Sequence, residues 1–307
     1  MKIAVVGAGA MGSIFGACFV RGGHDTVLVD VAPGLIERIN TAGVTIVRDG
    51  EETVTRVPAT SDTASVGQVD AVAFCVKCYH TESAVELARP LVGPETVVAS
   101  LQNGWGNGDV LAQAFPAEQI VVGVTYNSGT VLDVAKVAHP GVGPTTLGSF
   151  ADGTTEGAER LAGALSDGGL EARVASPVRP EIWKKLILNA ASLPSAALTG
   201  MTAGAMGASE DMCALMSATA AEAVAVARAL GFDIDERERI DTILGVSKRA
   251  GSTKASMLQD VEGGRRTEID VINGAVVRAA DEVGVAVPLN RAFVQLIHGW
   301  ETQRGLR

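Results

Sequence analysis

The sequence predicts an α/β fold in which a doubly wound sheet forms the N-terminal part and helices alone form the C-terminal part. The first half alternates short apolar runs with helical segments, a pattern typical of β–α–β units around a parallel sheet. From about Arg179 onward, strand-like alternation nearly vanishes and the apolar residues follow a helical period. The 307 residues also exceed one ordinary domain. We therefore expect two domains, residues 1–175 and 176–307, joined where Pro177 and Pro180 discourage regular structure.

The expected elements follow from these two periods. Strands are predicted at 2–6, 26–30, 44–47, 53–57, 69–76, 96–101, 120–124, 131–137 and 170–174. Residues 125–150 have no helical period and should add a few strands at a sheet edge. Helices are predicted at 10–21, 33–41, 81–89, 106–115 and 154–166, and in the second half at 180–198, 209–230, 234–250, 267–283 and 289–303.

Composition and charge argue against a nucleic-acid partner. The net charge is −10, from 25 basic and 35 acidic residues, and the longest basic runs are pairs such as Lys184-Lys185. A nucleic-acid binder usually carries a basic surface that neutralises phosphates. Aromatic residues make up only 4% of the chain, so stacking platforms for single strands are not expected either. An anionic ligand would need a locally built site.

The four cysteines are too few for a disulfide framework. Cys75 and Cys78 form a C-x-x-C pair, which is compatible with a redox motif, with half of a zinc site, or with a strand end lined by small apolar thiols. No second Cys/His pair stands at metal-binding spacing, so we expect no metal.

Two uncharged stretches resemble membrane signals. Residues 3–20 follow Lys2 as a signal peptide would, but they contain four glycines, and cleavage would remove the most informative motif of the chain. Residues 186–209 are long enough to span a bilayer, yet they contain Asn189 and several Ser, Thr and Gly residues. We expect a buried helix followed by a loop, no membrane association and a cytoplasmic location.

A glycine motif opens the chain. Gly7-x-Gly9-x-x-Gly12 directly follows the first predicted strand and begins the first predicted helix. In a dinucleotide-binding domain of Rossmann type, the first glycine makes a tight turn, the second lets the backbone approach a pyrophosphate, and the third lets helix pack on strand. The helix N-terminus adds N–H groups and a positive dipole. The candidate cofactor-binding residues are Gly7, Ala8, Gly9, Ala10, Met11 and Gly12.

Asp30 ends the second predicted strand, 18 residues after Gly12. A carboxylate at that point accepts hydrogen bonds from the ribose hydroxyls of NAD and repels the 2′-phosphate of NADP. No Lys or Arg lies between Asp25 and Arg38 to hold that phosphate. The sequence therefore favours NAD, with NADP as the alternative.

Polar residues at two further places suggest a substrate site. Lys77 and Asn103 follow predicted strands, at the edge where doubly wound sheets bind ligands, although Asn103 with its following glycine is also compatible with a plain turn. Lys185 and Asn189 are four apart on an otherwise apolar helix and therefore share a face. Because burying such side chains unpaired is costly, that face is more compatible with a polar site.

A last cluster lies between Ser256 and Val277. We expect Glu268 one turn into the predicted helix 267–283, whose other positions are largely apolar. A carboxylate there is compatible with two roles: it interacts with the helix dipole, or it orients a lysine from another helix.

Eight motifs occur in an order and spacing that resembles the ketopantoate reductase family over nearly the whole chain. They are GAGAMG at 7–12, VK at 76–77, QNG at 102–104, HPG at 139–141, WKKLILN at 183–189, SMLQD at 256–260, TEID with NG within 267–274, and VAVPLN at 285–290. The resemblance implies a Rossmann domain, a helical domain and a cleft between them. It also implies that a nicotinamide cofactor gives hydride to a small-molecule 2-oxo acid.

The resemblance also implies roles for individual residues. Lys185 matches the family's general acid, and Glu268 the glutamate that holds it or binds a substrate hydroxyl. Lys77 matches a lysine of the cofactor side, and Asn103 an asparagine that contacts cofactor and substrate. The substrate would also meet Asn189 and Ser256. These roles agree with the chemistry, because a cation that donates a proton to the carbonyl oxygen stabilises the charge left by hydride attack.

Two departures from the family pattern affect the predicted substrate and cofactor. Leu193 stands where ketopantoate reductases have a second asparagine, which should weaken recognition of a substrate hydroxyl and favour an apolar substituent. Asp30 stands where NADPH-using members have a basic residue. An NAD-dependent D-2-hydroxy acid dehydrogenase with an apolar or aromatic, mandelate-like substrate is therefore the alternative to a ketopantoate reductase. A non-catalytic NAD(H)-binding regulator is a more remote one. The apolar helices of the second half are compatible with a homodimer surface and equally with the core of their own domain.

Overall fold

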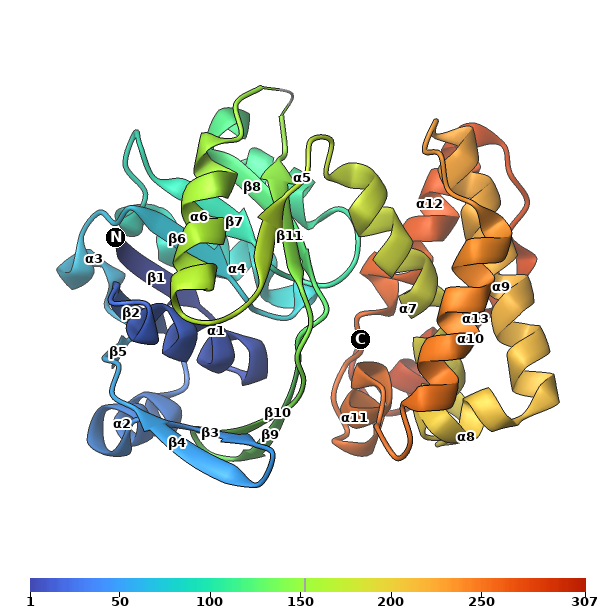
Figure 1. Cartoon of the computed structure of the whole chain (residues 1–307), viewed down its shortest axis with the longest axis horizontal. Coiled ribbons are helices and arrows are strands. Elements are labelled where there is room, and N and C mark those ends of the chain that lie inside the picture. The colour runs from blue at the N-terminus through green and yellow to red at the C-terminus, as the bar shows by residue number, and fades with distance from the viewer. Residues whose placement is uncertain (152) are drawn as a thin grey trace. The chain divides into compact units, whose positions relative to one another are not determined.

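The computed structural model describes residues 1–151 and 153–307. The chain divides into two compact units, which Figure 1 shows mainly in blue to green and mainly in yellow to red. The first comprises Met1–Gln102 and Asn107–Val178, and the second comprises Asn103–Gly106 and Arg179–Arg307. The division at residue 178 lies three residues after the predicted one, and the four residues Asn103–Gly106 belong with the C-terminal helices, which the sequence does not predict.

An eight-stranded sheet forms the centre of the first unit, in the order β12-β11-β8-β7-β6-β1-β2-β5. The strands are β1 (Lys2–Val6), β2 (Asp25–Val29), β5 (Ala59–Thr60), β6 (Ala71–Phe74), β7 (Val97–Ser100), β8 (Ile120–Thr125), β11 (Thr145–Ser149) and β12 (Ala172–Val174). β1 pairs in parallel with β2 on one side and β6 on the other. The predicted doubly wound sheet is therefore confirmed. β11 is one of the strands that the sequence expected within residues 125–150, but it is not the edge strand, because it pairs antiparallel with β8 on one side and parallel with β12 on the other.

Helices cover both faces of this sheet. They are α1 (Ala10–Arg21), α2 (Pro33–Ala42), α3 (Thr63–Val66), α4 (Thr81–Ala88), α5 (Asn107–Ala112) and α6 (Glu156–Asp167), with 3₁₀ turns η1 (Cys78–His80), η2 (Arg89–Leu91) and η3 (Ala117–Gln119). On β8, Val121 lies next to Gly157 of α6, whereas Val122 lies next to Gly108 of α5. Because successive strand residues point to opposite faces, α5 and α6 lie on opposite sides. α1 packs beside α6 (Figure 1).

A second, four-stranded sheet has the order β4-β3-β10-β9. Its strands are β3 (Val44–Arg48), β4 (Glu51–Thr55), β9 (Ser128–Asp133) and β10 (Lys136–Gly141). The predicted single strand 131–137 is wrong, because the chain turns at Val134 and Ala135 and Val131 pairs with Val137 across a hairpin. Ala135 has a φ of 57°, in the left-handed region that tight turns use. Apolar residues continue through the turn, so the pattern of apolar and polar residues does not reveal that the strand is interrupted there.

The second unit is helical, as the sequence predicts. It contains α7 (Arg179–Thr199), α8 (Ala203–Ala208), α9 (Glu210–Ala229), α10 (Glu236–Arg249), α11 (Ser256–Glu262), η4 (Ile269–Val271), α12 (Asn273–Val283) and α13 (Pro288–Gln303). The predicted helix 267–283 is wrong at its start, because α12 begins only at Asn273. Glu268 therefore precedes a short 3₁₀ turn and does not stand one turn into a helix. The backbone leaves helical geometry at Ile272, whose ψ is −97°.

α7 and α9 form the centre of this unit's core. Trp183, Leu186 and Ala190 of α7 are buried in the same apolar cluster as Ala220 and Val224 of α9. Over the described part of the chain, α9 is the one helix with the length and apolar character of a membrane span, and its window is 39% buried in the unit. Core helices of folded proteins often pass that test, so it is weak evidence for a membrane segment.

Candidate active site

The glycine loop between β1 and α1 has the geometry that the sequence predicts. Gly7 has a φ of +97°, which side chains rarely adopt. A Cβ on Gly12 would overlap the carbonyl oxygen of Gly7, so helix and strand can approach this closely only with glycine there. A Cβ on Gly9 would meet no described atom within 4 Å. The loop is thus tightly packed at Gly7 and Gly12 and open at Gly9.

The helix that follows begins at Ala10, with Met11 in its first turn. Among the described residues no side chain caps α1, and its first turn contains no acid. The positive end of its dipole therefore faces the open side of the loop without a compensating charge from its own first turn. Together with the space at Gly9, this arrangement fits the pyrophosphate of a dinucleotide.

Asp30 is connected to the same loop. The backbone N–H of Ala8 donates a hydrogen bond to its Oδ2 at 2.8 Å, and that of Ala32 donates to its Oδ1 at 3.0 Å. Each carboxylate oxygen has a second lone pair, so this half-buried side chain can still accept hydrogen bonds from two hydroxyls. Asp30 therefore fits the hydroxyls of an adenosine ribose, and it also holds the glycine loop through Ala8.

The residues after β6 lie beside the glycine loop. Cys75 packs next to Gly12, and burial raises the pKa of its thiol to about 12. Because the thiolate is the reactive form, this supports the apolar interpretation of Cys75 over the redox one. Lys77 lies three residues past β6 and directly before η1, half-buried at the carboxyl edge of the sheet. Within residues 1–151 and 153–307, no three His, Cys, Asp or Glu side chains are grouped to hold a metal.

In the second unit, Lys185 is the centre of a polar group. Its Nζ donates a hydrogen bond to Oδ1 of Asn103 at 2.8 Å. Burial lowers the pKa of Lys185 to about 8, while the negative charge of Glu268 acts in the opposite direction and raises it. Glu268 itself is only 6% exposed. The structure therefore brings together three predicted site residues that are far apart in sequence. Lys185 stands 82 positions after Asn103 and 83 positions before Glu268.

Asn103 reaches Lys185 because the segment after it packs against residue 271. Gly104 has a φ of +91°, and a Cβ there would overlap the carbonyl oxygen of Val271. The same carbonyl accepts a hydrogen bond from the N–H of Trp105 at 2.9 Å. The Trp105 and Trp183 rings lie 5.8 Å apart. Gly104 is therefore needed for close packing, which is a stronger requirement than a plain turn.

The other predicted substrate residues lie on helices of this unit. Asn189 is 6% exposed and stands one turn after Lys185 on α7. Ser256 is the first residue of α11, which packs against α7. Leu193, one further turn along, is 7% exposed and belongs to the apolar core. The polar character of this helix face ends at Asn189.

Sequence reasoning did not identify some residues that support these positions. Gln102 donates from Nε2 to the carbonyl of Val76 at 3.0 Å and to Oγ1 of Thr81 at 2.8 Å, which links the ends of β6 and β7. Thr267 and Glu301 form hydrogen bonds directly beside Glu268. Gln102 and Thr267 each stand in a motif, QNG and TEID, which is a signal in the sequence. Glu301 stands in none of the motifs, and its contact joins residues 34 positions apart.

Comparisons with known proteins match the chain in two parts. The model of "Ketopantoate reductase PanE/ApbA" matches residues 3–152, and that of its C-terminal region matches residues 177–301. The 2-dehydropantoate 2-reductase of Halobacterium salinarum is 32% identical over 97% of this chain and 98% of its own. That of Archaeoglobus fulgidus is also 32% identical, over 98% of each chain.

Solved structures agree with this result. A D-mandelate dehydrogenase, solved with NADH and anilino(oxo)acetate, superposes with a TM-score of 0.95 at 28% identity and covers all of both chains. A ketopantoate reductase from Ralstonia eutropha has a TM-score of 0.89 at 31% identity, over 99% of this chain and 100% of its own.

Proposed function

Because the chain belongs to the ketopantoate reductase family of nicotinamide-dependent oxidoreductases, we propose that it reduces a 2-oxo acid to a 2-hydroxy acid, with 2-dehydropantoate as the first candidate substrate. The observation that carries this proposal is the Lys185 ammonium, held by Asn103 beside the buried Glu268. An ammonium in this setting suits a group that gives a proton to a substrate oxygen.

The proposed chemistry assigns a step to each of these three side chains. The nicotinamide, when bound, supplies hydride to the carbonyl carbon. As negative charge develops on the carbonyl oxygen, Lys185 donates its proton there and the product hydroxyl forms. With a pKa of about 8, the lysine is mostly protonated at neutral pH yet releases its proton more readily than an exposed lysine. Asn103 orients the ammonium, and Glu268 stabilises its charge.

We assign the cofactor to the first unit. Residues 7–12 form the cradle for the pyrophosphate, with Gly9 leaving the space, and Lys77 supplies a cation at the same sheet edge. Asp30 favours NAD, because its carboxylate accepts hydrogen bonds from ribose hydroxyls and repels a 2′-phosphate.

A second candidate is a D-2-hydroxy acid dehydrogenase with an apolar or aromatic side chain on its substrate. Two observations favour it: the apolar Leu193 where the polar face of α7 ends, and the fold likeness to a D-mandelate dehydrogenase. In both candidates Asn189 and Ser256 bind substrate. They differ in whether a hydroxyl on the substrate is recognised.

The test is reduction of a panel of 2-oxo acids by the whole chain, with NADH and NADPH compared. A large preference for 2-dehydropantoate supports the first candidate, and a preference for phenylglyoxylate supports the second. Lys185→Ala should lower kcat by about a hundredfold or more with unchanged cofactor binding. Lys184→Ala is the matched control, because Lys184 pairs with Glu181 at 2.7 Å about 100° around the same helix. Near-normal turnover of Lys185→Ala would refute the mechanism.

A further inference from the structure

A fully buried carboxylate on α13, that of Glu301, contacts Thr267, the residue before Glu268. Oε1 of Glu301 accepts hydrogen bonds from the backbone N–H of Thr267 at 2.8 Å and from its hydroxyl at 2.7 Å. Oε2 accepts from Nη1 of Arg307 at 3.1 Å. The exposed fraction of Glu301 is 0%. Since an unpaired buried charge is very costly, these contacts are what allow a glutamate at this position.

Because Glu301 holds Thr267, it also restricts the backbone of Glu268, the next residue in the chain. The Thr267 hydroxyl accepts a hydrogen bond from the N–H of Ile269 at 3.3 Å, and the carbonyl of Glu268 accepts one from the N–H of Val271 at 3.2 Å. Glu268 lies outside the α-helices, so no helical ladder fixes its backbone. Its position therefore depends on contacts of this kind.

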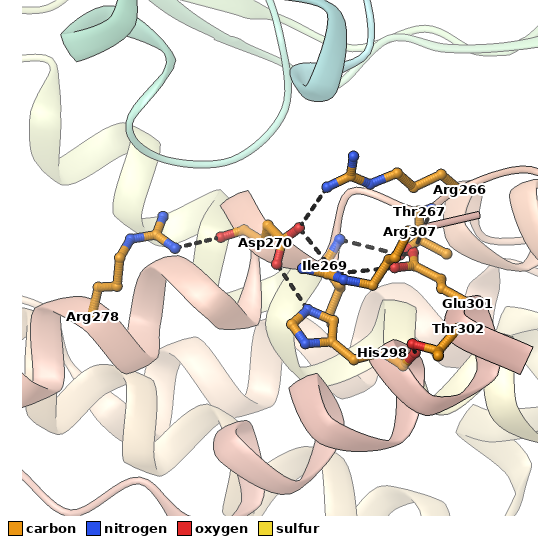
Figure 2. A network of polar contacts seen from close by, with 9 residues as sticks. All are labelled: Arg266, Thr267, Ile269, Asp270, Arg278, His298, Glu301, Thr302 and Arg307. Carbon is orange, nitrogen blue, oxygen red and sulfur yellow. Dashed lines mark hydrogen bonds and ion pairs between the residues drawn. The ribbon is translucent and has the colours of Figure 1, made fainter. Parts of the chain in front are cut away.

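A second set of contacts holds the same segment at Asp270, and Figure 2 shows both sets together. The Asp270 carboxylate accepts hydrogen bonds from Arg266 at 3.2 Å, from Arg307 at 3.2 Å and from His298 at 2.8 Å. Nη1 of Arg278 donates to its carbonyl oxygen at 3.0 Å. Arg307 contacts both carboxylates and so links the two sets.

We propose that Glu301 is a positioning residue for the reaction: it fixes Thr267 and thereby places the Glu268 carboxylate beside the Lys185 ammonium. The inference rests on the proposed role of Lys185 as proton donor. Glu301 contacts neither Lys185 nor the reacting atoms in this scheme and acts only through Thr267 and Glu268. A purely structural glutamate would stabilise the unit and leave the protonation of Lys185 unchanged.

Other charged groups lie in the same unit as the Lys185–Glu268 pair, and the test must separate their effects from that of Glu268. They are Lys184 and Glu181 on α7, Glu222 on α9, Asp260 with Arg265 from α11 and the loop after it, Arg266 and Asp270 beside Glu268, Arg278 on α12, and His298 with Arg307 from α13 and the residues after it. Most are held in ion pairs. His298 is the imidazole among them, and the test therefore needs a His298 variant.

The experiment measures kcat/KM for reduction as a function of pH, where activity is lost as Lys185 deprotonates. Glu301→Gln places an amide against Arg307 and removes the charge that holds Thr267. It should move the alkaline limb of the pH profile, where activity falls with rising pH, to lower pH by about half to one unit. The reason is that a less well positioned Glu268 raises the pKa of Lys185 less. Thr267→Val should move the alkaline limb in the same direction. Thr267→Ser keeps the hydroxyl and should therefore leave the limb where the unmodified enzyme has it. Thr267→Val decides the question if Glu301→Gln does not fold.

Glu222→Gln is the matched control. Glu222 accepts hydrogen bonds from the N–H groups of Leu289 at 2.9 Å and Asn290 at 3.0 Å, so its loss should lower Tm and leave the limb in place. His298→Asn should also leave the limb in place. In a Glu268→Gln background, Glu301→Gln should add no further shift, since the two act in series. A fall in Tm or kcat without a shift of the limb would overturn the proposal, as would an equal shift in His298→Asn.

A second readout keeps this proposal separate from the proposed function. The pH dependence of Lys185 acylation by acetic anhydride, followed by mass spectrometry, reports the pKa of that amine without any turnover. If no 2-oxo acid is reduced but the acylation midpoint still falls in Glu301→Gln, the proposed reaction fails and the positioning role stands. An unchanged midpoint in an active enzyme overturns the positioning role alone.

Discussion

Replacing Glu268 with Gln should make reduction by this enzyme fail at a lower pH. With a pKa of about 8, Lys185 is about 90% protonated at pH 7 and about 50% at pH 8. The Glu268 charge raises that pKa, and loss of a neighbouring opposite charge lowers a lysine pKa by about one unit or more. With a pKa of about 7, the protonated fraction falls to about half at pH 7 and about a tenth at pH 8.

The assay is kcat/KM for 2-oxo acid reduction between pH 6 and 9.5. The Glu268→Gln variant should lose about twofold at pH 7 and about fivefold at pH 8 through this effect alone, with little loss at pH 6. The sign follows from the role of Lys185, because a general acid works in its protonated form and rising pH removes that form. In the oxidative direction the neutral amine of Lys185 is the active form, so activity is lost on the acidic side of the profile. This acidic limb should also move to lower pH in the variant.

Glu181→Gln is the matched control for this variant, since it removes a carboxylate that pairs with the neighbouring Lys184 on the same helix. Its pH profile should match that of the unmodified enzyme. An alkaline limb of Glu268→Gln that stays in place or moves upward would refute the electrostatic argument, even if the variant is slower at every pH.

Further predictions concern the cofactor loop and substrate choice. Gly9→Ala should keep the Tm, because the added methyl meets open space, and should weaken cofactor binding, because that space is where the pyrophosphate is proposed to lie. Gly12→Ala should cost about 1–3 kcal/mol of stability, because its methyl overlaps the Gly7 carbonyl. Equal Tm values of the two variants would contradict this difference. Asp30→Asn should lower the NADH-over-NADPH ratio of kcat/KM about tenfold, which steady-state kinetics would check. Leu193→Asn should shift preference toward hydroxylated 2-oxo acids and lower the unfolding free energy by about 1–3 kcal/mol, and unchanged preference in the panel would separate Leu193 from substrate recognition.

Local patterns predicted much of the fold. The first strand, the glycine loop and α1 agree with the structure, since strand burial, positive φ at Gly7 and close packing at Gly12 each demand particular residues there. The helical nature of the second half was also predicted. In the candidate site, the pairing of Lys185 with Asn103 was not derivable from spacing, and only the family resemblance brought those residues together before the structure did.

The errors come from contacts between distant residues. Glu268 was placed inside a helix because its neighbours have helical periodicity, but Thr267 is held by Glu301, 34 positions away, and α12 starts later. The hairpin turn at Ala135 was missed because β9 and β10 join β3 in a separate sheet, and apolar residues run through the turn. Propensity describes a segment in isolation, and tertiary contacts override it.

The four residues Asn103–Gly106 set a rule for recombining this protein with its relatives. They belong to the second unit although the first unit continues on both sides of them. A chimera joined only near Val178 would inherit Asn103 from one parent and Lys185 from the other. Gly104 and the Val271 carbonyl against which it packs would be divided in the same way. An exchange of catalytic units between family members should therefore transplant this short segment together with the helices.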